Sequence, residues 1–187
     1  MIGSTNGTDL VPIVGAINSG ELLASVEVII SNNELSGILK KASTYGIEGH
    51  FICHKNKKRD VFDLEMSQIL ENKKIDLILL IGFMRILSPD FVDRWDGKII
   101  NVHPSLLPKY AGGMNNDVHE SVLAAGDKET GCTIHLVTKE VDGGPILLQK
   151  SCPVFENDTV HSLKERVQKL EGKAFIEVIN NWSNYEY

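Results

Sequence analysis

The chain has 187 residues, of which 42% are hydrophobic and 24% are charged, with 19 Lys and Arg against 25 Asp and Glu and a formal net charge of −6. A length of this order suits one domain that buries roughly 70% of its unfolded surface. The acidic balance argues against a general binder of nucleic acid or membrane surfaces, because both partners are polyanionic. No apolar run approaches the ~20 residues that span a bilayer. The three widely spaced cysteines indicate reduced thiols in a cytoplasmic protein.

The chain opens with a turn-rich loop, GSTNGTDL (3–10), that leads into a predicted helix. Such a loop should follow a buried strand, yet only Met1 and Ile2 precede it. Either the first strand is nearly absent or the natural start lies upstream. The sequence leaves both alternatives open.

Short β-rich runs then alternate with helical periodicity. Six runs are predicted as strands: 25–31, 50–54, 75–81, 98–102, 133–137 and 146–149. The run 75–81 is apolar on nearly every residue, which indicates a strand covered on both faces. Apolar spacing predicts helices around 35–42 and 62–70, another after Ser88-Pro89, and a last helix that starts at Asp158 or Thr159.

This alternation predicts an α/β fold with a doubly wound, mostly parallel sheet flanked by helices. We expect residues 1–187 to form a single domain, because no linker or repeat divides them. From about residue 131 the order changes to two strand-like runs separated by TKEVDGG (138–144), so this half is expected to differ from the first.

The loop 3–10 and the end of the run 98–102 are candidate ligand sites. Free backbone N–H groups at a helix start make the loop a plausible anion cradle, with an ordinary βα turn as the alternative. Asn101 and His103 point to the same side, because side chains alternate along a strand. In open α/β sheets ligands bind outside the carboxyl ends of the strands, which favours a functional role over a purely structural one for this pair.

Two further segments are weaker candidates when taken alone. The two glycines of EVDGGP (140–145) leave Asp142 free to face a histidine, although a plain turn is the commoner explanation. Gln168 and Glu171 lie three residues apart and therefore on one helix face, for which a solvated surface is the alternative.

Other combinations of reactive residues are not predicted to be sites. His50, Cys53 and His54 are close in sequence, but strand alternation separates them and the sequence offers no fourth metal ligand. Ser105 lacks the Gly-x-Ser-x-Gly elbow of a serine nucleophile. Among the remaining histidines, His135 is expected nearest to a site.

Three segments together resemble the folate-dependent formyltransferases: DLILLIGFMRILSPDFV (76–92), NVHPSLLPKY (101–110) and EVDGGPILLQKSCPV (140–154). This group includes methionyl-tRNA formyltransferase, formyltetrahydrofolate deformylase and the hydrolase module of formyltetrahydrofolate dehydrogenase. Two features favour the phosphoribosylglycinamide formyltransferases. Asn6-Gly7-Thr8 is similar to their phosphate loop, and the chain ends soon after the last helix.

The resemblance implies transfer of the formyl group of 10-formyltetrahydrofolate, a co-substrate, to the amine of glycinamide ribonucleotide in purine biosynthesis. It implies a cytoplasmic, Rossmann-like enzyme with these small-molecule partners and with no metal, nucleic acid or membrane. A homodimer is left open. The alternatives are another formyl-folate-dependent transferase or hydrolase, and a folate-binding protein without turnover.

The resemblance also implies roles for individual residues. The catalytic set corresponds to Asn101, His103 and Asp142. The set that binds the acceptor substrate corresponds to Gly7, Thr8, Asp9, Gln168 and Glu171. The set that binds folate corresponds to Arg59, Met84, Arg85, Ile86, Leu87, Asn101, Thr138, Lys139, Glu140, Val141 and Asp142.

The first half of the chain is thereby expected to form a phosphate-binding α/β unit, and the half from about residue 100 to carry the catalytic and folate-binding loops. The chain departs from the family most in its nearly absent first strand, and also at three other places. Asp9 stands where Asn is usual, Gly172 stands where His often follows the Glu, and the stretch 111–117 is longer than in many members.

Overall fold

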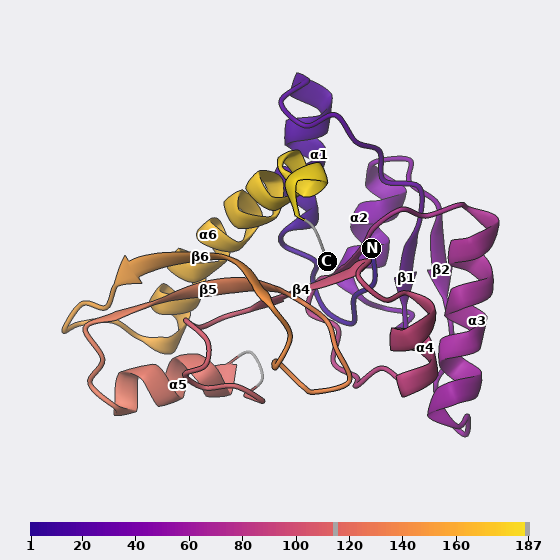
Figure 1. Cartoon of the computed structure of the whole chain (residues 1–187). Helices are drawn as coiled ribbons and strands as arrows, with labels where there is room; N and C mark the ends of the chain where they lie inside the picture. The colour runs from indigo at the N-terminus through magenta and orange to yellow at the C-terminus, as the bar shows by residue number, and fades with distance from the viewer. Residues whose placement is uncertain (114–115, 186–187) are drawn as a thin grey trace.

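A computed structural model describes residues 1–113 and 116–185 of the chain (Figure 1). Helices and strands alternate from the N-terminus, as the periodicity predicts. The helices are α1 (Leu10–Ser19), α2 (Gly37–Thr44), α3 (Arg59–Asn72), α4 (Pro89–Arg94), α5 (Asn116–Ala124) and α6 (Val160–Asn180), followed by the short 3-10 helix η1 (Trp182–Asn184). The strands are β1 (Ile29–Ser31), β2 (Gly49–Phe51), β3 (Ile78–Leu80), β4 (Ile99–His103), β5 (Glu129–Leu136) and β6 (Ile146–Pro153).

The strands form a sheet in the order β2–β1–Ile2–β3–β4–β5–β6, in which Ile2 makes parallel bridges to Ile30 and Leu80. The pairs β1–β2 and β3–β4 are parallel, whereas β4–β5 and β5–β6 are antiparallel. The predicted α/β fold with a mostly parallel sheet is confirmed. The change of order expected near residue 131 corresponds to the antiparallel hairpin of β5 and β6.

The segment Met1–Gly3 occupies the centre of this sheet. The backbone N–H of Ile2 donates to Leu79 O at 2.9 Å, and Ile2 O accepts from Ile81 N at 2.9 Å. On the other side, Met1 O accepts from Ile30 N at 2.9 Å, and Gly3 N donates to Ile30 O at 3.0 Å. The first strand is therefore nearly absent as an element, but its hydrogen bonds to both neighbours are made.

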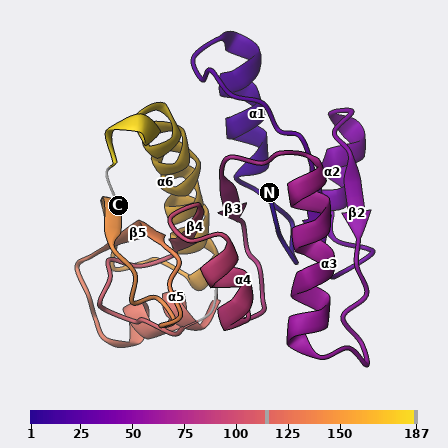
Figure 2. The same ribbon diagram turned by 45° about the vertical axis from the view of Figure 1, so that its right-hand side comes forward.

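Helices cover both faces of the sheet and bury an apolar cluster on each. One cluster joins α1, α2 and α6 to the sheet and includes Leu10, Ile38 and Phe175. The other joins α3 and α4 to the opposite face, which lies toward the viewer in Figure 2, and includes Phe62 and Phe91. This arrangement explains the run 75–81, because Leu79 and Ile81 belong to the first cluster and Ile78 and Leu80 to the second.

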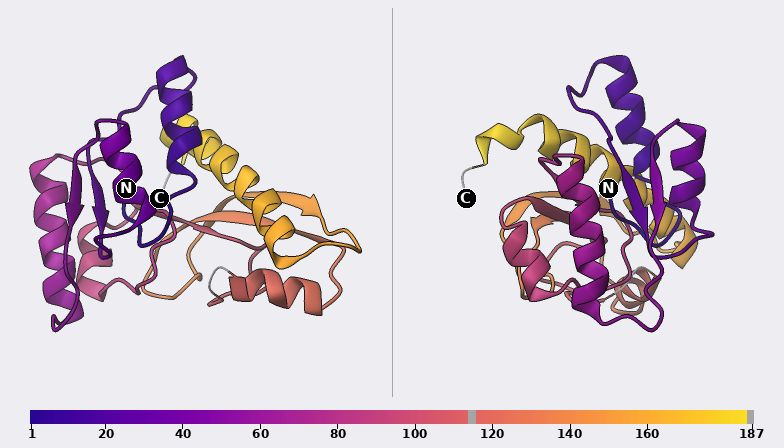
Figure 3. Two further views of the ribbon diagram at one scale, coloured as in Figure 1. Left: turned by 180° about the vertical axis from the view of Figure 1, so that it is seen from behind. Right: turned by 90° about the vertical axis from the view of Figure 1, so that its right-hand side faces the viewer.

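The longest helix, α6, runs along β5 and β6 (Figure 3). Its start agrees with the predicted boundary, because the side chain of Thr159 accepts a hydrogen bond from Ser162 N and caps the helix. A Cβ atom at Gly172 would lie 2.5 Å from Pro12 Cγ of α1, so the close contact of the two helices requires glycine there. Within the described residues, no helix has the length and apolar character needed to cross a membrane.

Each of the six runs predicted as strands overlaps an observed strand, with shifted boundaries, whereas apolar spacing does not predict α5 at residues 116–124. The buried face of α5 consists of Val118, His119 and Val122. A histidine in the middle of this face interrupts the apolar periodicity that would have indicated a helix.

We expect Ile2→Ala to lower the free energy of unfolding by about 3 kcal/mol, because the Ile2 side chain is 0% exposed and its loss leaves a cavity between the strands. Urea denaturation followed by circular dichroism would measure the change. The matched control is Leu23→Ala, since Leu23 is 94% exposed and should cost less than about 0.5 kcal/mol. Equal effects of the two substitutions would contradict a central role for Ile2.

Candidate active site

The polar side chains of Asn101, His103, His135 and Asp142 meet at the C-terminal end of β4. Asp142 lies between two histidines, with its Oδ2 3.3 Å from His103 Nδ1 and its Oδ1 3.5 Å from His135 Nε2. The side-chain amide Nδ2 of Asn101 lies 3.2 Å from His135 Nε2. The structure therefore brings the three residues of the predicted catalytic set into one connected cluster and adds His135 to it.

The register of β4 and β5 explains how Asn101 and His135 meet. Asn101 pairs directly with His135, and His103 pairs with Thr133 two residues further along. Side chains of directly opposed residues in an antiparallel pair lie close together on one face. Because residues 101 and 103 share a face, the end of this strand pair presents two histidines and an amide side by side.

The turn before β6 holds Asp142 against this face. Asp142 has a left-handed backbone conformation with φ of 53°, which Asp and Asn adopt more readily than other non-glycine residues. The backbone N–H of Gly112 donates to Asp142 Oδ2 at 2.7 Å. A Cβ atom at Gly144 would lie 1.9 Å from Leu136 O, so glycine at that position lets the turn fold back onto β5.

Burial and neighbouring charges act in opposite directions on the pKa values of His103 and Asp142. Burial lowers the pKa of His103, and this effect exceeds the opposing effects of the Asp142 carboxylate and of the hydrogen bond to Tyr110 O. Burial also raises the pKa of Asp142, but its contact with His135, the hydrogen bond from Gly112 N and the charge of His103 hold that pKa below its usual value. Asp142 is thus the ionised member of the cluster near neutral pH.

The larger of two neighbouring pockets opens beside this cluster. It is lined by residues of three segments, 83–87, 101–104 and 137–142. These include every residue of the predicted folate-binding set except Arg59, which is exposed at the first position of α3. The side chain of Arg85 turns to α3, where its guanidinium carbon lies 4.8 Å from the centre of the Phe62 ring.

The smaller pocket lies between the first loop and α6. Its lining includes all five residues of the predicted acceptor-binding set. The buried backbone of Gly7 requires glycine, because φ is +58° and a Cβ atom would lie 2.4 Å from Ile38 Cγ1. His119 of α5 also lines this pocket, a position that no sequence pattern indicates.

The two pockets meet at the end of β4. Val102 and Pro104, on either side of His103 in the chain, line both of them. A ligand in each pocket would therefore approach the cluster from a different side.

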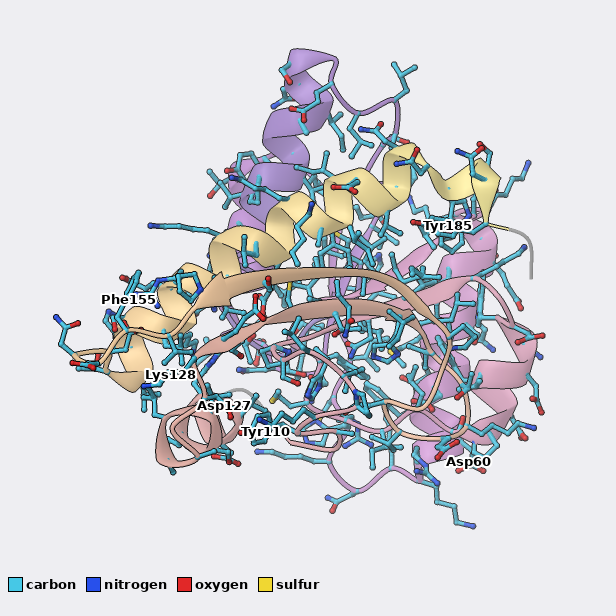
Figure 4. All side chains as sticks on the ribbon, turned by 60° about the vertical axis from the view of Figure 1, so that its left-hand side comes forward. Asp60, Tyr110, Asp127, Lys128, Phe155 and Tyr185 are labelled. Atoms are coloured by element: carbon cyan, nitrogen blue, oxygen red, sulfur yellow. The ribbon has the colours of Figure 1, made fainter. Side chains whose placement is uncertain are left out.

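The loop after β4 is tied down by polar contacts. Figure 4 shows Tyr110 and Asp127 close together, and the Tyr110 hydroxyl donates to Asp127 Oδ2 at 2.8 Å. The Ser105 hydroxyl donates to Lys109 O at 2.5 Å and thereby stabilises the loop. The long stretch noted at 111–117 includes residues 114 and 115, which lie outside the described residues.

A family model described as formyl transferase matches residues 1–179 of the chain. The chain belongs to the formyl transferase family. With this assignment, the predicted family resemblance is confirmed.

Curated relatives of this formyl transferase differ greatly in length. The chain is 38% identical over 178 residues to the phosphoribosylglycinamide formyltransferase of Escherichia coli, and the match covers 95% of this chain and 82% of that enzyme. It is 43% identical over 173 residues to the bovine trifunctional purine biosynthetic protein adenosine-3, covering 92% of this chain. The chain spans only 17% of the length of that bovine protein.

Solved structures agree with this assignment. The glycinamide ribonucleotide transformylase 1 of Symbiobacterium toebii superposes with a TM-score of 0.92 at 32% identity, covering 98% of this chain and 85% of that one. The phosphoribosylglycinamide formyltransferase of Coxiella burnetii superposes with a TM-score of 0.91 at 38% identity, covering 100% of this chain and 88% of that one. A formyltetrahydrofolate deformylase from Pseudomonas syringae gives 0.83 at 22% identity, covering 96% of this chain and 60% of that one, which shows a shared fold alone.

His135 was not included in the catalytic set predicted for this formyl transferase. Its Nδ1–H donates to Leu136 O at 2.8 Å, which fixes the orientation of the ring and turns Nε2 toward Asn101 and Asp142. The expectation that His135 lies nearest to a site among the remaining histidines agrees with this position, whereas its contact with Asn101 depends on the pairing of residues 101 and 135. Within the part of the chain that the structure describes, no group of three His, Cys, Asp or Glu residues is arranged to hold a metal ion.

We expect Asp142→Asn to lower the pKa of His103 further, by about one unit or more, because the substitution removes the charge that favours the imidazolium form. Asn keeps the left-handed backbone accessible, so the turn should persist. Histidine Cε1–H signals in an NMR titration would report the shift. The signal of His161, whose side chain is 82% exposed, serves as the internal control. An unchanged or raised pKa of His103 would show that the carboxylate does not act on it.

Proposed function

We propose that this chain transfers the formyl group of 10-formyltetrahydrofolate to the primary amine of glycinamide ribonucleotide in purine biosynthesis. The observation that carries the proposal is the meeting of two pockets beside His103, one containing nearly all the expected folate-binding residues and the other all the expected acceptor-binding residues. The names of the Escherichia coli and Coxiella burnetii relatives support this choice of acceptor.

The smaller pocket is suited to the phosphate end of the acceptor. Gly7, Thr8 and Asp9 immediately precede α1, whose N-terminus carries free N–H groups and the positive end of the helix dipole. Gln168 and Glu171 face the same space from α6 and are assigned to the glycinamide end.

The larger pocket is assigned to the folate. The pterin would be bound largely by main-chain groups of residues 84–87 and 138–142, which line the pocket on either side of Asn101. Arg59 remains a predicted partner for the glutamate tail. It lies outside the pocket lining but near Asp63, a carboxylate on which Arg85 also acts.

Attack of the amine on the formyl carbon places negative charge on the formyl oxygen. The Asn101 amide has two N–H donors, of which one is directed to His135, so the other is available to this oxygen. His103 Nε2–H donates to Tyr110 O at 3.0 Å in the structure, and it must exchange this acceptor for the formyl oxygen. Donors of this kind stabilise an oxyanion without a covalent nucleophile.

Asp142 is assigned to proton transfer. Its carboxylate favours the protonated form of His103 and offers an acceptor for a proton released by the attacking amine, directly or through water. The proton would then pass to the nitrogen of the departing folate. The contact with His135 holds the second carboxylate oxygen in place.

We further infer that residues 1–187 act as one formyltransferase domain, with a phosphate-binding first half and with the catalytic and folate-binding loops after about residue 100. The match of one family model to residues 1–179 supports a single domain. A cytoplasmic location remains a prediction from the sequence, which leaves the oligomeric state open.

The direct test is an assay of formyl transfer by the purified chain, with folate release followed by absorbance. Turnover that depends on glycinamide ribonucleotide is the expected result. Folate release without acceptor would indicate a hydrolase, and folate binding without release would indicate a binding protein. Either of these outcomes would overturn the proposal.

We expect His103→Ala to lower kcat by about 10²–10³-fold while folate binding persists, because the substitution removes an oxyanion donor at the end of β4. Asn101→Ala and Asp142→Asn should also reduce kcat severely. Steady-state kinetics and fluorescence titration with a folate separate the two effects. His161→Ala is the matched control, since this exposed histidine lies on the outer surface of α6. Near-normal turnover of His103→Ala would refute the mechanism.

A further inference from the structure

Two carboxyl groups are buried in the smaller pocket. Asp9 is 3% exposed and Glu171 is 7% exposed, and both line the cavity beside Gly7. Asp9 stands at the N-cap position of α1, but its side chain makes no capping hydrogen bond, and its Oδ1 is buried without a partner among the described residues. Nδ1 of His119, in the same lining, is also buried with no hydrogen-bond partner in residues 1–113 and 116–185. Two unpaired polar atoms in one small cavity indicate that a polar ligand completes it.

The groups around Asp9 come from three other elements. Burial raises the pKa of Asp9 to about 7. Burial, and next the charge of Asp9, raise the pKa of Glu171 of α6, which Lys164 of the same helix opposes. On β5, the pKa of the Cys132 thiol is raised by burial and then by both carboxylates, so the thiol stays neutral.

On α5, burial lowers the pKa of His119 to about 4, with Lys164 and His103 acting in the same direction. His119 is therefore a neutral group at physiological pH and does not neutralise the acids. The frame of the cavity nevertheless suits an anion. The ten-residue helix α1 begins at its edge, and Thr5 and Thr8 provide hydroxyl groups.

An anion bound in this small pocket and an ionised Asp9 carboxylate would repel one another. A protonated carboxyl group can instead donate a hydrogen bond to a phosphate oxygen. Asn, the residue usual at position 9 in the family, donates through its amide without any change of protonation.

We propose that Asp9 binds the phosphate monoester of the acceptor as a protonated hydrogen-bond donor, so that phosphate binding takes up one proton from solution. The inference rests on the proposed function only for the identity of the acceptor. Before binding, Asp9 is mainly ionised at pH 8, because its pKa is raised to about 7, and the raised pKa of Glu171 favours the protonated form of that acid. Phosphate binding then protonates Asp9.

Calorimetric titration with ribose 5-phosphate at pH 8 tests this coupling. This probe carries the phosphate but no amine, and its phosphate is already a dianion, because the second pKa of a phosphate monoester is about 6. Repeating the titration in two buffers of different ionisation enthalpy gives the number of protons taken up. We expect about one proton per ligand bound. Uptake near zero, or no binding of the probe, would overturn the proposal.

The matched variant is Asp9→Asn, which keeps the size of the side chain and supplies a donor that does not titrate. Its proton uptake should be near zero, and its affinity for the probe at pH 8 should exceed that of the unaltered chain by about tenfold. Asp76→Asn, which alters an exposed acid, should behave like the unaltered chain. Equal proton uptake by the unaltered chain and Asp9→Asn would assign the proton to another group and overturn the proposal.

The outcomes also separate this inference from the proposed function. Formyl transfer to glycinamide ribonucleotide without proton uptake on phosphate binding would refute the role of Asp9 alone. Proton-coupled binding of ribose 5-phosphate without formyl transfer would support the role of Asp9 and refute the assigned acceptor.

Discussion

The backbone hydrogen bonds of Met1–Gly3 to both neighbouring strands are the constraint on which the rest of the structure depends. They join the pair β1–β2 to the strands β3–β6 and make one sheet of two groups. Both apolar clusters pack against this junction, since Ile2 belongs to one and Met1 to the other. Because every strand after it is placed relative to this segment, the position of the active cluster at the end of β4 follows from it.

The junction also connects the two pockets. The chain leaves Gly3 and enters the first loop, where the Ser4 hydroxyl accepts from Met84 N at 2.9 Å and donates to Asn32 Oδ1 at 2.6 Å. Met84 belongs to the segment 83–87 that lines the larger pocket, so the Ser4 side chain ties the loop of the smaller pocket to the wall of the larger one. The relative placement of the two proposed substrates is thereby built into the sheet.

Local pattern predicts those parts of this fold that depend on local interactions. Alternation along one strand sufficed to place Asn101 and His103 on the same face. Periodicity located the strands and the start of α6 at Thr159. Asp142 could be assigned only by family resemblance, because its approach to His103 depends on the pairing of β5 with β6. A central strand represented by Ile2 has no periodicity to detect.

The same limit explains why local sequence pattern does not reveal which residues are neighbours in the smaller pocket. Asp9 and Glu171 are separated by most of the chain, and only the packing of α1 against α6 brings them together. His119 belongs to a helix whose apolar face it interrupts. Pattern at the scale of a helix turn or a strand cannot reveal such long-range neighbours.

The two pockets share Val102 and Pro104 in their lining, and the turn after β3 contributes to both, with Ile81 and Gly82 in the smaller pocket and Phe83 in the larger. Their remaining lining residues belong to different segments of the chain. The acceptor side is built from the first loop, α5 and α6, and the donor side from the turns after β3 and β5. Substitutions in α5 and α6, neither of which lines the larger pocket, can therefore accumulate without altering the wall assigned to the folate. Such a division allows one scaffold to diversify toward new amine acceptors, in evolution or in design, while it retains a common one-carbon donor.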